Sequence, residues 1–220
     1  ESLSVESQSE VPPALASKFP WVTHEALRTF SILDLSSIVA TPVGRQNGFA
    51  IRAPFSGEPI CARCEGNDPN FFFFYQDVIT KLGIQFLFSP FQTEVLTHLR
   101  IAPSQLHPNN WTYVRTFELF CEDLGILCTV PLFFYYYFPQ TGRTGKDPPE
   151  RKGWVSLRSQ TKRKLFTPYI DSFKGFKDKY FKVVAEPGQQ PFFLSGPESS
   201  DAEWAFPLYW LQDHYRQDRS

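Results

Sequence analysis

Two cysteines separated by two residues, Cys61 and Cys64, have the spacing of half a zinc site. A retroviral-type zinc knuckle would also need a histidine after the second cysteine, and Pro69 stands at that position. The other two cysteines, Cys121 and Cys128, lie far along the chain. A four-cysteine site and a set of free, mostly buried thiols both fit this spacing. We predict that the chain binds no metal and no cofactor.

Acidic side chains are the second group that could do chemistry, since transposases and integrases need three carboxylates that converge on divalent metal ions. None of the acidic residues lies at the end of a convincing series of strands, and solvated helix faces explain most of them. The residues considered are Asp77, Glu94, Glu118, Glu122, Asp123 and Asp171. The chain also lacks P-loop, GxGxxG and GxSxG motifs. We therefore expect no catalytic residue and no enzymatic activity, with DNA strand transfer on a carboxylate cluster as the alternative.

None of the four histidines belongs to an HExxH pair or to a recognisable nucleophile motif. These histidines are His24, His98, His107 and His214. His107 directly precedes Pro108, at a position where a side chain often caps a helix or packs at its entry.

Positive charge is concentrated in residues 141–182, which hold twelve Lys and Arg against four Asp and Glu. The formal net charge of the whole chain is −1, so the remaining residues are acidic. Lys and Arg can neutralise phosphates, and aromatic faces between them can stack on bases. The segment is therefore the predicted nucleic-acid-binding region. Its predicted contact residues are Arg151, Lys152, Arg158, Lys162, Arg163, Lys164, Lys174, Lys177 and Lys179.

The aromatic residues of this segment also fit a second interpretation. They are Trp154, Phe166, Tyr169, Phe173, Phe176, Tyr180 and Phe181, and they alternate with the cations. A β meander with its rings facing the core and its lysines facing water gives the same alternation. We expect the cations to form one continuous exterior patch, with the rings mostly turned inward.

The composition is that of a globular protein with one substantial core or two small ones, at 220 residues with 42% hydrophobic and 20% charged residues. The 23 Phe, 9 Tyr and 5 Trp can build such a core with few aliphatic residues. No apolar run approaches the roughly 20 residues that cross a bilayer, so we expect no membrane role. Four cysteines favour an intracellular setting, in the nucleus or cytoplasm. Because the chain contains no Met, we expect it to be part of a longer product.

The chain is predicted to have four segments. Residues 1–18 form a disordered leader that is rich in Ser, Glu and Pro. Residues 19–184 form a single α+β domain that is predominantly helical, with a helical block followed by a small antiparallel β meander. Residues 185–203 form a linker, and residues 204–220 form a segment that docks back onto the domain.

Helix signals dominate the middle of the chain. Apolar residues at helical spacing predict a helix over residues 69–82, stopped by Gly83. A second helix is predicted from Ser89, where Gln92 can close a capping box. A third is predicted over residues 108–124, with Arg115 and Glu118 spaced to pair on its outer surface. For the third helix, Val114, Phe117, Cys121 and Leu124 are the predicted inner face, and Gly125 ends it.

Residues 130–138, "VPLFFYYYF", are read either as a further helix or as a buried strand. Residues 141–153 are predicted to form a mobile loop because of their composition. Beyond this loop, three short β-prone runs over residues 154–159, 164–169 and 176–184 are predicted to form the meander.

The run "LGIQFLFSPFQTEVLTHLRIAPSQLHPNNWTYVRTFELFCEDLGI", followed by "LFFYYYF", "KGWVSL" and "SFKGFKDKYFKVV", resembles a plant domain called "putative gypsy-type transposon" or "transposase, gypsy type". The resemblance covers residues 70–184. Its most specific pieces are "APSQLHPN", "FELFCEDLG" and the pair "GWVSL" and "FKGFKDKYF", taken in this order and spacing.

This resemblance implies a protein encoded by, or descended from, a plant long-terminal-repeat retrotransposon. The word "transposase" describes the genetic setting, and the resemblance transfers no catalytic residue. It implies a non-enzymatic, gag-like domain that associates with itself, binds RNA or DNA through the basic segment, or does both. No small-molecule substrate is expected. A DNA transposition enzyme and a domesticated host protein-interaction module are the alternatives.

Overall fold

The computed structural model describes residues 13–22, 26–27, 48–65, 69–143, 151–166, 175–195 and 203–212. About 33% of the described part is helical and about 20% lies in strands. The α+β class predicted from the sequence is confirmed, but the prediction of a predominantly helical fold is wrong. None of the described helices has the length and apolar character needed to cross a membrane.

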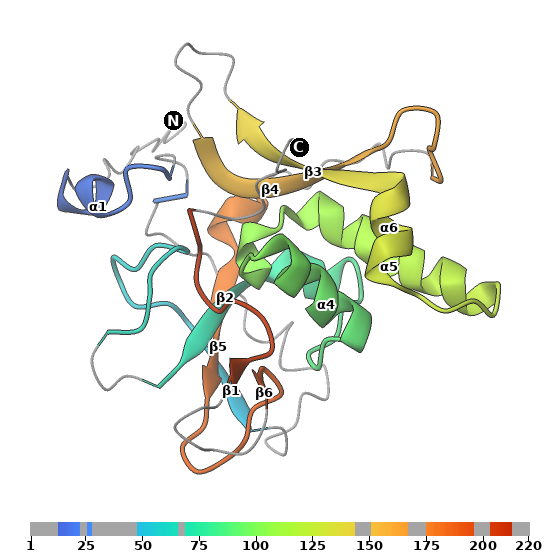
Figure 1. Ribbon diagram of the computed structural model, residues 1–220. Helices are drawn as coiled ribbons and strands as arrows, with labels where there is room; N and C mark the ends of the chain where they lie inside the picture. Colours follow the sequence, from blue (N-terminus) through green and yellow to red (C-terminus); the bar gives the residue numbers. More distant parts are fainter. Residues whose placement is uncertain are drawn as a thin grey trace, which may run out of the picture.

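A three-stranded antiparallel sheet lies at the centre of the fold (Figure 1). Its strands are β1 (Phe49–Arg52), β2 (Phe71–Tyr75) and β5 (Tyr180–Ala185), with β5 in the middle. Phe74 of β2 lies opposite Phe181 of β5. β1 and β2, both from residues 49–75, therefore hold between them a strand that lies more than 100 residues further along the chain.

Strand β2 and the short helix α3 (Gln76–Thr80) replace the single helix predicted over residues 69–82. The helical spacing of the apolar residues there was coincidental, because all five residues of β2 are buried. Rings two residues apart touch, at 5.3 Å between the Phe71 and Phe73 centroids and 6.4 Å between Phe72 and Phe74. A strand that is buried on both faces needs a continuous apolar run and shows no alternation.

The two long helices begin where the sequence places them. Helix α4 (Pro90–Leu99) has the predicted capping box, in which Ser89 and Gln92 satisfy each other's backbone N–H groups. Helix α5 (Pro108–Asp123) is followed by Gly125, which has a φ of 63°. The predicted inner face of α5 is buried except at its last residue, Leu124, which is exposed. Leu124 is exposed because it follows the last helical turn and lies beyond the core.

The predicted β meander is wrong, because the strands belong to separate sheets. After helix α6 (Val130–Tyr136), strand β3 (Tyr137–Arg143) pairs with β4 (Arg151–Ser159) in an antiparallel hairpin. This hairpin uses both ends of the predicted mobile loop, and residues 144–150 lie outside the described residues. β5 instead pairs with β1 and β2, which are distant in sequence.

The described parts of both chain ends pack against the domain. Residues 1–12 of the predicted leader are outside the described residues, but Pro13–Lys18 form helix α1, so the predicted disorder does not extend to Lys18. In the predicted linker, Phe193 is fully buried and β6 (Leu194–Ser195) pairs with β7 (Glu203–Trp204). Trp210, in the last described segment, is also buried.

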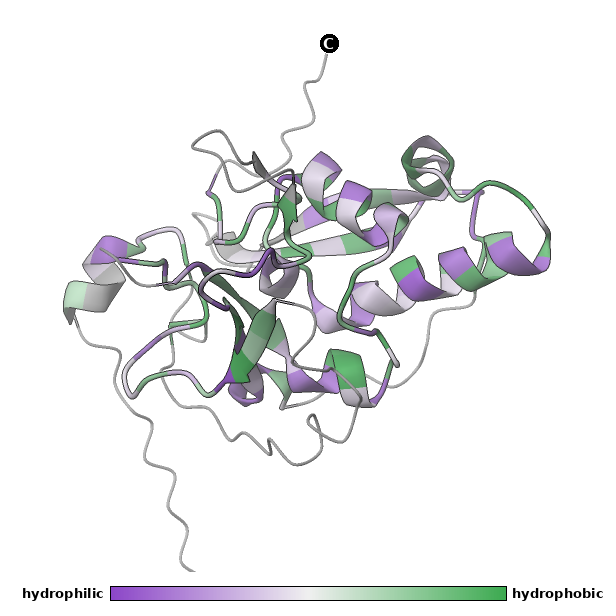
Figure 2. Ribbon diagram, turned by 90° about the horizontal axis from the view of Figure 1, so that it is seen from below, coloured by the Kyte–Doolittle hydropathy of each residue, from purple (hydrophilic) through white to green (hydrophobic). Residues whose placement is uncertain are grey.

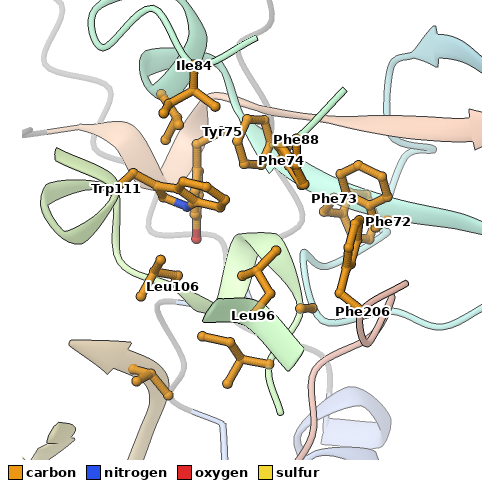
Figure 3. Close-up of a cluster of buried hydrophobic side chains, with 14 of the residues drawn as sticks. Phe72, Phe73, Phe74, Tyr75, Ile84, Phe88, Leu96, Leu106, Trp111 and Phe206 are labelled. Atoms are coloured by element: carbon orange, nitrogen blue, oxygen red, sulfur yellow. The ribbon is translucent and has the colours of Figure 1, made fainter. Parts of the chain in front are cut away.

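Aromatic rings form most of the core, and hydrophobic residues run along the central strands (Figure 2). Trp111 of α5 meets Phe74 edge-on, with 5.3 Å between the ring centroids. Phe206, from the C-terminal segment, packs against Phe72 and Phe88 at 5.4 Å each (Figure 3). Rings from β2, α5 and the C-terminal segment therefore meet in one core.

Candidate nucleic-acid interface

The predicted contact cations fall into groups that the structure places at different ends of β4. Arg158, at the end of β4, and Lys162, Arg163 and Lys164 are all exposed. We call residues 158–166 the basic turn. Arg151 and Lys152 lie at the start of β4, where their side chains are outside the described residues, and Lys174 is outside the described residues altogether.

The basic turn is fixed at several points to the helices beneath it. The backbone N–H of Gln160 donates to the Tyr136 carbonyl at 2.7 Å. The ring of Phe166 lies edge-on to Phe120 of α5, with 5.7 Å between centroids. The Arg163 guanidinium lies over the exposed ring of Tyr135, 4.0 Å from its centroid. The turn is therefore held against both α5 and α6 while its lysines face water.

Lys177 and Lys179 lie near the other end of β4 and are half-buried. Lys177 is part of the short 3-10 helix η2 (Phe176–Asp178), Lys179 follows it, and the Lys177 ammonium lies 5.2 Å from the Trp154 ring centroid. A strand rises about 3.3 Å per residue, so Trp154 and Arg158 are about 13 Å apart along β4. The described cations therefore form two groups along this strand.

Most rings of the basic segment serve the core. Trp154, Phe176, Tyr180 and Phe181 are buried, Phe166 is half-buried, and Tyr169 and Phe173 lie outside the described residues. The buried rings cannot stack on bases without opening the core. The exposed ring beside the cations is Tyr135 of α6, which no sequence signal marks because it lies in an apolar run outside the basic segment.

Lys182 contributes to the charge of the basic segment but is not available at the surface. Its side chain is 6% exposed, and its ammonium pairs with Glu58 at 2.5 Å. The same ammonium lies 4.2 Å from the ring centroid of Phe71 and 4.3 Å from that of Phe55. In β5, Lys182 is therefore part of an internal ion pair beneath aromatic rings.

The CxxC cysteines take different environments. Burial raises the pKa of the Cys61 thiol to about 12, so this thiol is protonated at neutral pH. The Cys64 thiol lies 3.8 Å from the carbonyl oxygen of Pro69. Burial likewise raises the pKa of the Cys128 thiol to about 12. Within the described residues, no three His, Cys, Asp or Glu side chains form a group that could hold a metal ion.

Within the described residues, the acidic side chains considered for catalysis do not converge on a point that could hold a metal ion. Asp77 is buried and pairs with Lys81 at 2.7 Å. Glu118 accepts hydrogen bonds from the Ser89 hydroxyl and from Gln92 Nε2. Glu94, Glu122 and Asp123 are exposed on helices, and Asp171 lies outside the described residues.

Arg115 pairs with Glu118 at 3.7 Å, as the helical spacing predicts. However, the Glu118 side chain is largely buried, because it also caps the interface between α5 and the start of α4. Glu118 is therefore a structural link between two helices.

The described histidines have structural contacts. His107 is the N-cap of α5, and its Nδ1 accepts a hydrogen bond from the Asn109 backbone N–H at 3.2 Å. This confirms the role predicted for it. His98 stacks on Phe134 with 4.7 Å between ring centroids. His24 and His214 lie outside the described residues.

Residues 74–140 match a family model described as "Putative gypsy type transposon". This confirms the resemblance to that family seen in the sequence. The matched stretch contains helices α3 to α6 and ends within β3, so it includes Tyr135 but none of the predicted contact cations. No curated protein and no solved structure matches the chain.

Proposed function

We propose that this chain is a non-enzymatic domain of a retrotransposon-derived plant protein that binds single-stranded RNA or DNA weakly through the basic turn. In this proposal the protein acts inside the cell, in the nucleus or cytoplasm. The transposon-derived family is supported by the match over residues 74–140. The binding role is our own inference from the surface.

One observation carries the binding role: four cations are exposed on a turn that the fold holds in place. These cations are Arg158, Lys162, Arg163 and Lys164. Anchoring of the turn to α5 and α6 lowers the entropy that would be lost when the cations order on a phosphate chain. Tyr135 and Arg163 together offer an exposed stacked pair on which a base could rest.

The expected affinity is low and depends on salt. For a single strand, each phosphate that a Lys or Arg neutralises makes the logarithm of the binding constant fall by about 0.7 per tenfold rise in salt concentration. Four cations can meet only a few phosphates, so we expect micromolar or weaker binding, on the order of nonspecific complexes. The chain as a whole has a formal net charge of −1, so the attraction has to be local.

The test is the double charge reversal K162E/K164E, measured by fluorescence anisotropy with a labelled single-stranded oligonucleotide at several salt concentrations. We expect the variant to bind at least about tenfold more weakly at low salt and to show a smaller salt slope. The matched control is R52E/R100E, which makes the same change in net charge at two exposed arginines elsewhere on the fold.

Three results would contradict the binding role: no binding by the unmodified chain at low salt, binding that ignores salt, or an equal loss in the control. A loss confined to the variant in the basic turn would support it. Circular dichroism of both variants would show that the fold is retained.

Self-association is a second candidate function, and one observation favours it. Several aliphatic side chains at the end of α5 are exposed. Exposed apolar side chains that lie together mark interaction sites more often than isolated ones do.

A further inference from the structure

The basic turn carries one hydroxyl that the proposed function does not use, that of Thr161. Thr161 is exposed and is followed directly by the cations Lys162, Arg163 and Lys164. The N–H of Arg163 donates to the carbonyl of Gln160 at 3.1 Å, which closes a β-turn with Thr161 at its second position. Lys162, at the third position, has a φ of 65°, as a type II turn requires. Thr161 is therefore at the tip of the orange loop that follows β4 in Figure 1.

The other exposed threonines are placed differently. Among the threonine side chains that the structure describes, Thr80 and Thr97 are also exposed, and both lie in helices. Their hydroxyls donate to carbonyl groups four residues earlier, at 3.1 Å to Gln76 and 2.9 Å to Thr93. A protein kinase binds its acceptor segment in an extended or turn conformation, so these two helices would have to unwind first. Thr161 follows a strand and is already in a turn.

The charges around Thr161 match the chemistry of one class of kinase. Arg158 lies three residues before Thr161, at the end of β4, and its side chain is exposed. The residues at the same offset from the two helical threonines are acidic, Asp77 and Glu94. A kinase with carboxylates in its substrate groove pairs with an arginine at this offset and repels an anion there. Such a kinase therefore distinguishes Thr161 from the two helical threonines by charge.

We propose that Thr161 is a phosphorylation site for a protein kinase that recognises arginine three residues before its acceptor, and that the phosphate weakens nucleic-acid binding by the basic turn. In the reaction the Thr161 oxygen attacks the γ-phosphorus of ATP, so that a new O–P bond forms and the bond to the β-phosphate oxygen breaks. ADP leaves, and the hydroxyl proton passes to the catalytic Asp of the kinase. The effect on binding rests on the function proposed above, whereas the acceptor site does not.

The phosphate offsets about half of the positive charge of the basic turn. Its four exposed cations carry one positive charge each, and a phosphothreonine carries about −1.5 to −2 at pH 7. Consecutive Cα atoms are about 3.8 Å apart, so the Cα atoms of Lys162 and Arg163 are at most about 8 Å from that of Thr161. This is about one Debye length at physiological ionic strength, so salt does not fully screen the phosphate from these cations.

Phosphorylation of the full chain in vitro tests the acceptor site. The probe is ATP with Mg2+ and a purified kinase that requires arginine at this offset, and peptide mass spectrometry locates the phosphate. We expect phosphate on Thr161 and none on Thr80 or Thr97. Arg158→Ala should lower the initial rate at least about tenfold, because it removes the charged group that the kinase binds. The matched control Arg52→Ala removes an exposed arginine elsewhere on the fold and should leave the rate unchanged.

Two results would overturn the acceptor site: no phosphate on Thr161, or an Arg158→Ala chain that is phosphorylated as fast as the unmodified one. Circular dichroism of Arg158→Ala and Arg52→Ala would show that both variants are folded.

The phosphorylated chain then tests the effect on binding. Fluorescence anisotropy with the same labelled single-stranded oligonucleotide compares it with the unmodified chain. At low salt we expect at least about tenfold weaker binding and a smaller salt dependence, because about two of the four positive charges are offset. Removal of the phosphate by a phosphatase should restore the affinity. In the control, Thr161→Ala incubated with kinase and ATP should bind as tightly as the same variant incubated without kinase.

The outcomes separate this inference from the proposed function. Unchanged affinity after phosphorylation of Thr161 would overturn the regulation, while binding through the basic turn stands. An equal loss of affinity in treated Thr161→Ala would place the effect at another residue and would also overturn the regulation. An unmodified chain that binds no nucleic acid would overturn the proposed function and the regulation together, and the mass spectrometry would then decide the acceptor site by itself.

Discussion

Gly153 allows the C-terminal segment, through Trp210, to pack closely against the domain. Gly153 has a φ of 79°, and a Cβ placed on it would lie 2.7 Å from Trp210 Cζ3. Its carbonyl accepts a hydrogen bond from Gln105 Nε2 at 3.0 Å, and the same nitrogen donates to Leu211 at 2.8 Å. Trp210 cannot move aside, because it is buried and its indole N–H donates to Ser104. Gly153 is therefore required both by its backbone conformation and by the space available.

Replacement of Gly153 by Ala should lower the free energy of unfolding by about 3 kcal/mol. About 1 kcal/mol of this comes from the left-handed backbone, and the rest from the clash with Trp210. Gly188 provides the control, since it has a φ of 73° and a Cβ placed on it would meet no atom within 4 Å. Gly188→Ala should lower the free energy of unfolding only by the backbone contribution of about 1 kcal/mol. Urea denaturation of both variants measures the difference, and equal costs would show that the clash is relieved by rearrangement.

At the level of elements, the sequence was most informative where local hydrogen bonds decide the structure. The starts of α4 and α5 followed from Ser89, Gln92 and His107, whose side chains bond to backbone groups two or three residues away. Strand β2 was not predicted because its extended conformation depends on contacts with residues that are distant in the sequence. Phe72 meets Phe206, which lies far along the chain, and such contacts leave no local pattern.

The candidate site was predictable in its composition but not in its geometry. The charge count identified Lys162 and Lys164, which are exposed, but it also included Lys182, which is buried against Glu58. An alternating pattern on a central strand does not show which face of the strand is exposed to solvent and which is covered by other parts of the protein. Tyr135 was missed because its exposure depends on how α6 packs, which the sequence of α6 alone does not determine.

The link between α4 and α5 can be measured as a coupling between side chains. The Ser89 hydroxyl accepts from the Gln92 backbone N–H at 3.1 Å and also donates to Glu118 of α5. Ser89→Ala should therefore cost about 1–2 kcal/mol, the upper part of the range for an N-cap. Thr129, the N-cap of α6, serves as the comparison, because its hydroxyl accepts from Leu132 at a longer 3.4 Å. Thr129→Ala should cost less, about 0.5–1 kcal/mol.

A double-mutant cycle separates the cap from the link to α5. If the hydroxyl of Ser89 stabilises the protein partly through Glu118, then Ser89→Ala should cost less in a Glu118→Gln background than in the unmodified chain. Thermal or urea unfolding of the four proteins gives the coupling. Costs that simply add would mean that Ser89 acts only within α4.

For the molecule as a whole, the aromatic core sets a limit on stability at alkaline pH. Burial raises the pKa of the Cys61 thiol from its ordinary 9.0 to about 12. Burial also raises the pKa values of the Tyr75 and Tyr180 hydroxyls above their usual range. All three groups are neutral when protonated, so the folded protein keeps protons that the unfolded chain releases. The contribution of Cys61 is complete below about pH 9 and is lost progressively between about pH 9 and 12, whereas that of the two tyrosines is lost only from about pH 10 upward.

We therefore expect the free energy of unfolding to fall as the pH rises above about 9. Each such group contributes a slope of up to about 1.4 kcal/mol per pH unit once its unfolded form is ionised. Urea unfolding at closely spaced pH values from neutral to strongly alkaline measures this slope. Cys61→Ala removes one of the groups, so its curve should be shallower above pH 9, whatever its stability at neutral pH. An identical slope in this variant, or a flat profile for the unmodified chain, would show that the thiol ionises in the folded state as readily as in the unfolded one.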